Sequence, residues 1–459
     1  MELFLRWGID DILEKRILLP ANLPQRGIWC STLNDKAYFV GTLGDNSFIN
    51  DESPKRAIRI PLWITEEVLR QRVKDFPGVT FLRNHNVQNI ELLQDFIEVV
   101  SWDALSRNSI TYQGRFLACC DGAYGPSKKL LNNHFKPLSE ESRILSVTFQ
   151  SHDIMQKKKV PDGIFYSTLT KEVSGFLSPI NLKEGIWLAQ VVWVQDAEMP
   201  DDIHLSAVLD KMVGEPFKKK LVDRHFWNMQ VQIAEFFNLK NQIFWLGDSA
   251  HAFAPTGGLG LNTGFGDAYN LGWKLAYVIK QFGNLSLLET YEQERYPVWM
   301  NNLLFAKKNA DDFLKIKQYY SIDQDLDAFG HANAKLGNQF LNSSKLTMGY
   351  RYGEEDTSPF IEDGETDFSY NPVVEVGYFL PHTRDKYGKS IYDKLSSVEW
   401  NLICDRDEVP KDFLNGFPLS KILNVIHVET GRYPYKFLLV RPDWHIAKVL
   451  GFVASVNRE

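Results

Sequence analysis

Cysteine is scarce in this chain, and its spacing argues against two classes of site. The 459 residues contain four cysteines, Cys30, Cys119, Cys120 and Cys404, and none belongs to a C-x-x-C pair. Disulfide frameworks and structural zinc sites need cysteines at paired spacing. No cluster of His, Cys and Asp has metal-ligand spacing either. We therefore expect reduced thiols, a cytoplasmic location and no metal site.

Long apolar runs and an excess of positive charge are also missing. Residues 186–194 form one of the longest apolar runs, far short of the ~18 residues that cross a bilayer. Residues 1–16 have the pattern of an amphipathic helix with acids inside it, unlike a signal peptide. The net charge of -7 argues against nucleic-acid binding, and 44% hydrophobic residues are typical of a globular protein. We expect no membrane span and no nucleic-acid partner.

The most informative segment is residues 241–275, NQIFWLGDSAHAFAPTGGLGLNTGFGDAYNLGWKL. An apolar strand pattern ends at Gly247-Asp248, a glycine-rich loop follows, and a helical pattern runs from about Asn262 to Gln281. Glycines allow close backbone approach to a flat ligand, and a helix start offers unpaired N–H groups and positive dipole charge. Asp248 is placed to accept hydrogen bonds from ligand hydroxyls. These features suit a flavin, which carries hydroxyls and becomes negative when reduced.

This segment resembles the flavin-ribityl motif of the FAD-dependent aromatic hydroxylases, in the para-hydroxybenzoate hydroxylase fold family. The matching residues are Gly247, Asp248, Ala250, His251, Pro255, Gly257, Gly258, Gly260, Asn262, Gly264, Asp267, Ala268, Asn270, Leu271, Trp273 and Lys274. The next helix of the family is matched by Leu288, Tyr291, Glu292, Glu294, Arg295 and Pro297. The resemblance implies FAD as cofactor.

The resemblance also assigns residues to the cofactor site. Asp121-Gly122 follows a buried strand pattern at 115–120 and resembles the family's DG motif, which reaches the flavin pyrophosphate and the nicotinamide path. Lys128 stands where the family commonly has Arg, a point charge in place of a bidentate fork. The implied FAD-binding residues are Asp121, Gly122, Gly247, Asp248, Pro255, Gly257, Gly258, Gly260, Leu261 and Asn262. Pro255, which would lie against the reacting face of the flavin, is the one catalytic assignment.

Three further side chains are candidates for a role in proton transfer or loop support. The family pattern favours a loop-supporting role for His251 over a role as general base. Tyr166 and His225 are candidates for deprotonating the substrate, although no motif fixes either one. Several aromatic residues of the substrate sheet either line a substrate pocket or fill the core of the sheet: Phe149, Phe165, Tyr166, Phe176, Trp187, Trp193, Phe226 and Trp227.

One part of the family pattern is absent. Family members begin with a strand, a G-x-G-x-x-G turn and a helix that hold the FAD pyrophosphate. This sequence has no such turn directly after a strand, and its first residues resemble the helix that follows the unit. Two explanations stay open: translation assigned from an internal methionine of a longer enzyme, or a remnant that has lost tight FAD binding. The intact glycine motif favours the first.

The predicted fold is α/β with mixed α+β features. It comprises a Rossmann-like FAD/NAD(P)-binding domain without its first βαβ unit, an inserted β-sheet substrate domain and a thioredoxin-like C-terminal domain. The expected segments are 1–142 (FAD-binding domain, first part), 143–238 (substrate sheet), 239–345 (FAD-binding domain, second part, and helices), 346–373 (linker) and 374–459 (thioredoxin-like domain, implied by resemblance to the phenol hydroxylase branch).

Local patterns predict the individual elements. Helices are expected at 1–19, 65–75, 203–213 and in stretches of 286–340. Strands are expected near 79–83, 87–92, 96–101 and 110–112, and again at 145–150, 163–169, 174–180 and 186–194. Near the C-terminus we expect a strand at 399–404 and a strand-turn-strand over 437–447 that contains Arg441-Pro442-Asp443.

The resemblance implies an FAD-dependent monooxygenase. It would use NADH or NADPH and O₂ to hydroxylate a small aromatic substrate, phenolic or polyketide-like, through a flavin hydroperoxide, and it is compatible with a homodimer. One alternative is a truncated or degenerate flavin-fold protein without activity that acts as a binding or assembly partner. A narrower alternative is a flavoenzyme of the same fold that performs epoxidation or Baeyer–Villiger insertion.

Overall fold

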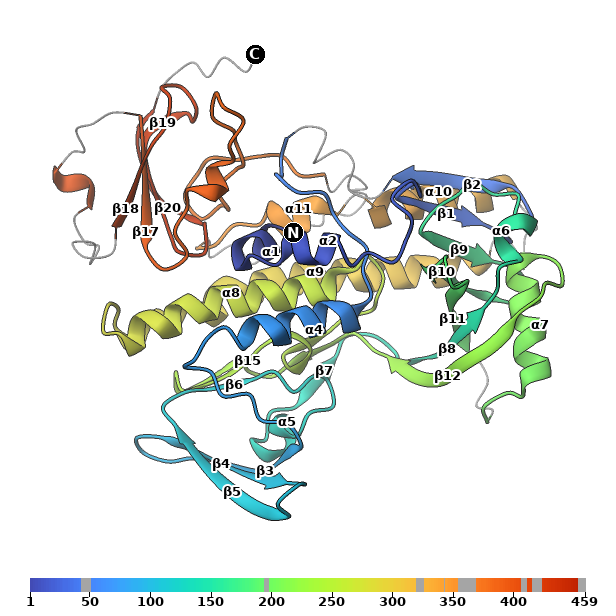
Figure 1. Ribbon diagram of the computed structural model, residues 1–459, viewed down its shortest axis with the longest axis horizontal. Helices are drawn as coiled ribbons and strands as arrows, with labels where there is room; N and C mark the ends of the chain where they lie inside the picture. The colour runs from blue at the N-terminus through green and yellow to red at the C-terminus, as the bar shows by residue number, and fades with distance from the viewer. Residues whose placement is uncertain are drawn as a thin grey trace.

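The computed structural model describes residues 1–42, 51–193, 198–318, 326–341, 343–353, 369–405, 411–414 and 423–452. Figure 1 shows a large sheet at one end of the molecule and the C-terminal sheet at the other. Two long helices, α8 (Leu259–Ile279) and α9 (Thr290–Gln318), occupy the centre between them. Among the described helices, none is both long and apolar enough to cross a membrane.

The large sheet has seven strands in the order β12-β8-β11-β10-β9-β1-β2. Their bounds are β1 Arg26–Cys30, β2 Ala37–Thr42, β8 Ser142–Gln150, β9 Phe165–Leu169, β10 Ser174–Asn181, β11 Ile186–Trp193 and β12 Lys220–Met229. Neighbouring strands are antiparallel except β1 and β9, which run parallel. Five strands come from residues 143–238 or begin one residue earlier, while β1 and β2 are recruited from the N-terminal part of the chain.

Strand alternation gives this sheet two different faces. One face carries Leu145, Tyr166 and Trp187, which pack in a buried apolar cluster with helix α7 (Asp202–Val213). The opposite face carries Phe165 and Phe176 and lies against α9 and α10 (Leu326–Leu341). There Phe165 stacks on Phe340 with ring centroids 5.3 Å apart, and Phe176 stacks on Phe313 at 4.8 Å. The sheet is therefore covered by helices on both sides.

The segment singled out by sequence folds as strand, loop and helix. Strand β15 (Ile243–Trp245) is fully buried and runs parallel to β6 (Leu117–Cys119), with the short β14 (Asn238–Leu239) on its other side. Two small sheets belong to the same part of the chain. One is a meander of β3 (His85–Leu92), β4 (Ile97–Asp103) and β5 (Asn108–Gly114). The other is a three-stranded sheet of β7 (Phe135–Pro137), β13 (Gln232–Ala234) and β16 (His251–Ala252). Helix α5 (Pro126–Leu130) follows β6.

The C-terminal part is a four-stranded sheet in the order β18-β17-β19-β20. Its strands are β17 Trp400–Cys404, β18 Leu423–His427, β19 Tyr435–Val440 and β20 Ile446–Phe452. One side of this sheet shares an apolar cluster with Trp273 and Tyr277 of α8. The C-terminal sheet is therefore packed on α8, and its thioredoxin-like character stays a prediction.

Several predicted elements need correction. The single N-terminal helix is wrong: α1 (Glu2–Trp7) ends at Gly8, whose φ of 68° breaks the helix before α2 (Asp10–Glu14). The helix expected at 65–75 begins one turn earlier, as α4 (Leu62–Val73). Helix α8 likewise begins at Leu259, so that Gly260 lies in its first turn. Helix α11 (Ser344–Met348) enters the expected linker, of which residues 354–368 lie outside the described chain.

The strand predicted near 79–83 is also wrong. Val79 and Phe81 are each 53% exposed, and no described strand pairs with this segment. An extended apolar segment becomes a strand only where a neighbouring strand satisfies its backbone groups. The apolar pattern was correctly located, but the pairing partner it requires is missing from the described chain.

Two glycine substitutions test how tightly these elements pack. Gly272 lies exposed in the middle of α8, where an added Cβ meets nothing within 4 Å. We expect Gly272→Ala to raise the free energy of unfolding by about 0.5–1 kcal/mol, because glycine is unfavourable in a helix interior. In Gly175→Ala the new Cβ would lie 2.3 Å from the backbone oxygen of Gln190, so we expect a loss of roughly 1–3 kcal/mol. Urea unfolding of both variants measures the difference, and equal midpoints would contradict the described packing.

Candidate functional site

The carboxyl ends of β6 and β15 bring the two sequence motifs side by side. The backbone N–H of Leu246 donates to the carbonyl of Cys119 at 3.1 Å, and the Ser249 hydroxyl donates to the same oxygen at 2.5 Å. The indole N–H of Trp245 donates to the Ser127 hydroxyl at 3.1 Å. The turns after the two strands, at 121–123 and 247–249, are therefore neighbours at the edge where open α/β sheets bind cofactors.

Asp121 and Lys128 organise the first of these turns. Both carboxylate oxygens of Asp121 accept hydrogen bonds from Ser127, one from its backbone N–H at 2.7 Å and one from its hydroxyl at 2.8 Å. The ammonium of Lys128 is buried and donates to the carbonyl of Gly122 at 2.8 Å. Lys128 thus holds the turn from inside, and the side of Gly122 where a Cβ would stand is open.

The second turn presents Asp248 at the surface. Asp248 lies in the short 3-10 helix η1 (Gly247–Ser249), and its side chain is exposed. Desolvation raises the pKa of this carboxyl above its ordinary value, while nearby His251 and Lys128 act in the opposite direction.

The glycine loop is shaped by backbone conformations that other residues rarely adopt. Gly257 and Gly258 have φ angles of 98° and 66°, and Gly258 is the N-cap of α8, where no side chain caps the helix. An added Cβ at Gly264 would lie 3.2 Å from the Cα of Gly247, so the first turns of α8 pack directly on the end of the motif strand. A Cβ at Gly258 would meet nothing within 4 Å, which leaves the start of α8 accessible to a ligand.

The other predicted cofactor residues surround this loop. Pro255, Leu261 and Asn262 are exposed, and Gly257 and Gly260 are half-buried. Asn262 donates through its side-chain amide to the carbonyl of Gly258 at 2.9 Å, which closes the first turn of α8. The structure therefore places these predicted residues on one accessible loop and helix start.

A buried carboxylate, Asp267, anchors the loop from below. Its Oδ1 accepts hydrogen bonds from Arg295 Nε at 2.8 Å and from the Trp299 indole at 2.7 Å. Its Oδ2 accepts from the backbone N–H of Gly247 at 3.1 Å and lies 2.6 Å from His251 Nε2. Although burial raises the pKa of Asp267, electrostatic interactions with His251 and Arg295 and hydrogen bonds from His251 and Trp299 lower it to about 2. Asp267 is therefore ionised, and it holds the Gly247 turn through a hydrogen bond.

His251 is part of this support. Because a carboxylate only accepts hydrogen bonds, the short contact with Asp267 places a proton on Nε2. The ring is fully buried between Phe253 and Trp299, and its Nδ1 has no partner among the described residues. This position agrees with a loop-supporting role, which stays a prediction.

The two candidates for substrate deprotonation lie elsewhere. Tyr166 is fully buried in the α7 face of the large sheet, its hydroxyl accepts the N–H of Gly163 at 3.0 Å, and burial raises its pKa. His225 lies exposed on the edge strand β12 beside Asp223. Neither side chain shares the cluster formed around the glycine loop.

Sequence analysis missed a row of residues that joins the loop to the large sheet. Phe305, Asn309 and Phe313 are spaced four apart on α9 and therefore share one face. A Cβ at Gly257 would meet Phe305 at 3.2 Å and the amide nitrogen of Asn309 at 3.6 Å, while Phe313 stacks on Phe176. Asn309 Oδ1 accepts from Gln339 of α10 at 2.6 Å, and its buried Nδ2 has no partner among the described residues.

The accessible residues fit one half of an FAD molecule. The open start of α8, with the exposed carboxylate of Asp248 beside it, offers N–H donors for a reduced ring and an acceptor for ribityl hydroxyls. Among the described strands, none pairs with the free edge of β6, where a further parallel strand and phosphate-binding turn would add the adenosine half. The fit is therefore to the isoalloxazine and ribityl portion.

Comparison with known proteins agrees with this geometry. Residues 23–306 match the model of the FAD binding domain family. The chain is similar to the FAD-dependent monooxygenase apdD of Emericella nidulans, with 25% identity over 83% of this chain and 67% of that protein. It is also similar to a putative polyketide hydroxylase of Streptomyces halstedii, with 30% identity over 41% of this chain, and spans about a third (34%) of that protein's length.

The fold is also that of a solved flavoenzyme. The flavin-dependent monooxygenase PieE, determined in complex with FAD and substrate, superposes with a TM-score of 0.84 at 20% identity and covers 97% of this chain and 87% of its own. This similarity confirms the predicted α/β hydroxylase fold. Because the family model matches more than half of the residues, this chain belongs to the FAD binding domain family.

Proposed function

We propose that this protein is an FAD-dependent monooxygenase that hydroxylates an aromatic substrate with NADH or NADPH and O₂. The observation that carries the proposal is the convergence of the Asp248 turn and the uncapped start of α8 at the carboxyl ends of β6 and β15. Similarity to the monooxygenase apdD and to a polyketide hydroxylase supports the same reaction class. A cytoplasmic location and a homodimer accompany this proposal as predictions.

The residues of the loop would hold the cofactor and exclude water. Bound FAD supplies the redox chemistry, since it takes a hydride from the nicotinamide and activates O₂. Asp248 would accept hydrogen bonds from ribityl hydroxyls, and the N–H groups at the start of α8 would stabilise negative charge on the reduced ring. Pro255, exposed on the same loop, would lie against the reacting face.

The large sheet offers a surface suited to an oxygen-bearing aromatic substrate. On the face toward α9 and α10, cross-strand pairs place Ser167 opposite Phe176, and Gln190 opposite both Phe176 and Ser146. The Ser167 hydroxyl is buried and has no partner among the described residues. The Ser167 hydroxyl would bind an oxygen atom of the substrate, next to Phe176, which stacks on Phe313 of α9.

A second candidate function rests on the free edge of β6. Because the described strands complete only the ribityl half of the site, a flavin-fold protein without activity, acting as a binding or assembly partner, is the competing proposal. Oxidation of NADH or NADPH by the FAD-loaded chain separates the two. Turnover of either nucleotide supports the enzyme, and bound FAD without any turnover supports the binding protein.

Substitution of Asp248 tests the proposed contact with the ribityl chain. We expect Asp248→Ala to weaken FAD binding at least tenfold, about 1.4 kcal/mol, because a charged hydrogen-bond acceptor for the ribityl chain is lost. The exposed Asp223 on β12 offers a matched control, Asp223→Ala, which leaves the affinity unchanged. Flavin fluorescence titration of the three proteins measures the effect, and equal affinities would refute the assigned role.

Substitution of His251 distinguishes a loop-supporting role from a catalytic one. His251→Ala leaves the buried Asp267 short of one hydrogen bond, so we expect a loss of roughly 1–3 kcal/mol in stability and lower FAD content. Turnover per bound flavin is expected to persist, because the residue supports the loop. His204→Ala, an exposed histidine on α7, is the control. Normal FAD content with abolished turnover would instead identify His251 as catalytic.

A further inference from the structure

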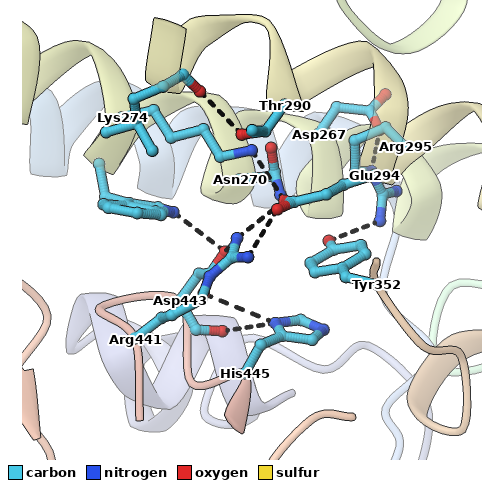
Figure 2. Close-up of polar contacts among 12 residues, drawn as sticks. Asp267, Asn270, Lys274, Thr290, Glu294, Arg295, Tyr352, Arg441, Asp443 and His445 are labelled. Carbon is cyan, nitrogen blue, oxygen red and sulfur yellow. Dashed lines mark hydrogen bonds and ion pairs between the residues drawn. The ribbon is translucent and has the colours of Figure 1, made fainter. Parts of the chain in front are cut away.

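The turn between β19 and β20 carries charges that face the flavin-binding half of the protein. Arg441 donates to both oxygens of Glu294 on α9, at 2.6 and 2.8 Å, and also to both oxygens of Asp443, at 3.0 and 2.6 Å. Figure 2 shows this cluster in the contact between the C-terminal turn and the central helices. A guanidinium held by two carboxylates in bidentate geometry is a strong and directional contact.

Helix α8 enters the same cluster. Lys274, which is fully buried, and the amide of Asn270 each donate to Glu294 Oε2 at 2.7 Å. The indole N–H of Trp273 donates to Asp443 Oδ2 at 3.0 Å. Because α8 begins at the glycine loop, these contacts fix the helix whose first turn forms the proposed flavin site. Helices α8 and α9 are thereby tied to one turn of the C-terminal sheet.

A second chain of contacts leads from the same turn to the loop itself. His445 stacks on Tyr352 with ring centroids 4.0 Å apart and an interplanar angle of 25°. The Tyr352 hydroxyl accepts a hydrogen bond from Arg295 Nη1 at 3.1 Å, and Arg295 Nε donates to Asp267 at 2.8 Å. Asp267 in turn accepts the N–H of Gly247. Figure 2 shows Tyr352 between His445 and Arg295.

We infer that Arg441, Asp443 and His445 are positioning residues for the glycine loop of the flavin site. The C-terminal sheet contacts that loop by two routes. In the first, Arg441 pairs with Glu294 of α9, which also accepts hydrogen bonds from α8. In the second, contacts run from His445 through Tyr352 and Arg295 to Asp267. The C-terminal sheet then contributes to the flavin site by holding its loop in place, in addition to packing on α8. This inference rests on the proposed function only for the identity of the ligand, because the amide exchange of the loop can be measured without FAD.

Simple packing of the C-terminal sheet makes a different prediction. The apolar contact of Trp273 and Tyr277 with Trp400 and Leu402, together with the hydrogen bond from the Tyr277 hydroxyl to the carbonyl of Val398, holds the sheet on α8 without Arg441. If docking were the only role, loss of the Arg441 pair would loosen the interface and leave the Gly247 turn, which lies at the far end of the contact chain, unchanged. The two views therefore differ in what happens at Gly247.

Amide hydrogen exchange of the full chain, without added FAD, tests the inference. In Arg441→Met we expect peptides that cover 247–263 to exchange roughly fivefold faster or more, because Glu294 and Asp443 lose their shared cation. Peptides from β8 to β11 of the large sheet serve as the internal reference and keep their protection. Arg432→Met, which removes a surface pair with Glu429 in the same sheet domain, is the matched control and leaves both regions unchanged.

Tyr352→Phe tests the second route and guards against misfolding of the first variant. It removes only the hydroxyl that accepts from Arg295, and the ring stays available to stack on His445. We expect faster exchange at 247–263 and unchanged exchange in β19 and β20. Protection equal to the unaltered chain at 247–263 in both variants, or an equal rise in every region, would overturn the inference.

FAD titration of the same variants separates this inference from the proposed function. Faster loop exchange together with an FAD affinity lowered several-fold supports both. If the variants show faster loop exchange but neither they nor the unaltered protein bind FAD, the positioning role is supported and FAD is refuted as the ligand. Normal exchange with normal FAD binding in both variants contradicts the positioning role alone.

Discussion

The buried carboxylate of Asp267 is the interaction on which the rest of the site depends. It receives a backbone N–H from the end of the motif strand, a side chain from the loop and two side chains from α9. A carboxylate is stable in so dry a position only when most of its acceptor sites are used by positively polarised donors. That requirement fixes where the strand, loop and helices meet, and so it fixes the position of the glycine loop that would face the flavin.

Several elements around Asp267 together position the glycine loop. Strands β6 and β15 align two turns, α8 presents its open start, and α9 carries Phe305, Asn309 and Phe313 from the loop to the large sheet. The C-terminal sheet fastens both helices through Arg441 and Glu294. The flavin loop is thus held from the strand side, from the helix side and from the C-terminal turn, which is the preorganisation that binding and catalysis require.

Sequence reasoning located the loop because its information is local. A buried strand, Asp248, three glycines with positive φ and a helix start all fall within 35 residues of sequence, so their pattern reports their geometry directly. Local patterns could not reveal the ion pair of Asp267 with Arg295, because these residues are 28 positions apart. The ion pair of Arg441 with Glu294 spans 147 positions and was missed for the same reason. The strand predicted near Val79 failed for a related reason, since a strand needs a neighbour that local pattern does not supply.

We propose that the turns after β6 and β15, together with the start of α8, form the flavin contact. Amide exchange of the full chain with and without saturating FAD is the decisive comparison. We expect FAD to slow exchange only at residues 121–125 and 247–263 and to leave the α7 face of the large sheet unaffected. Protection elsewhere in the chain, or none at FAD concentrations that saturate related flavoproteins, would refute this placement of the flavin.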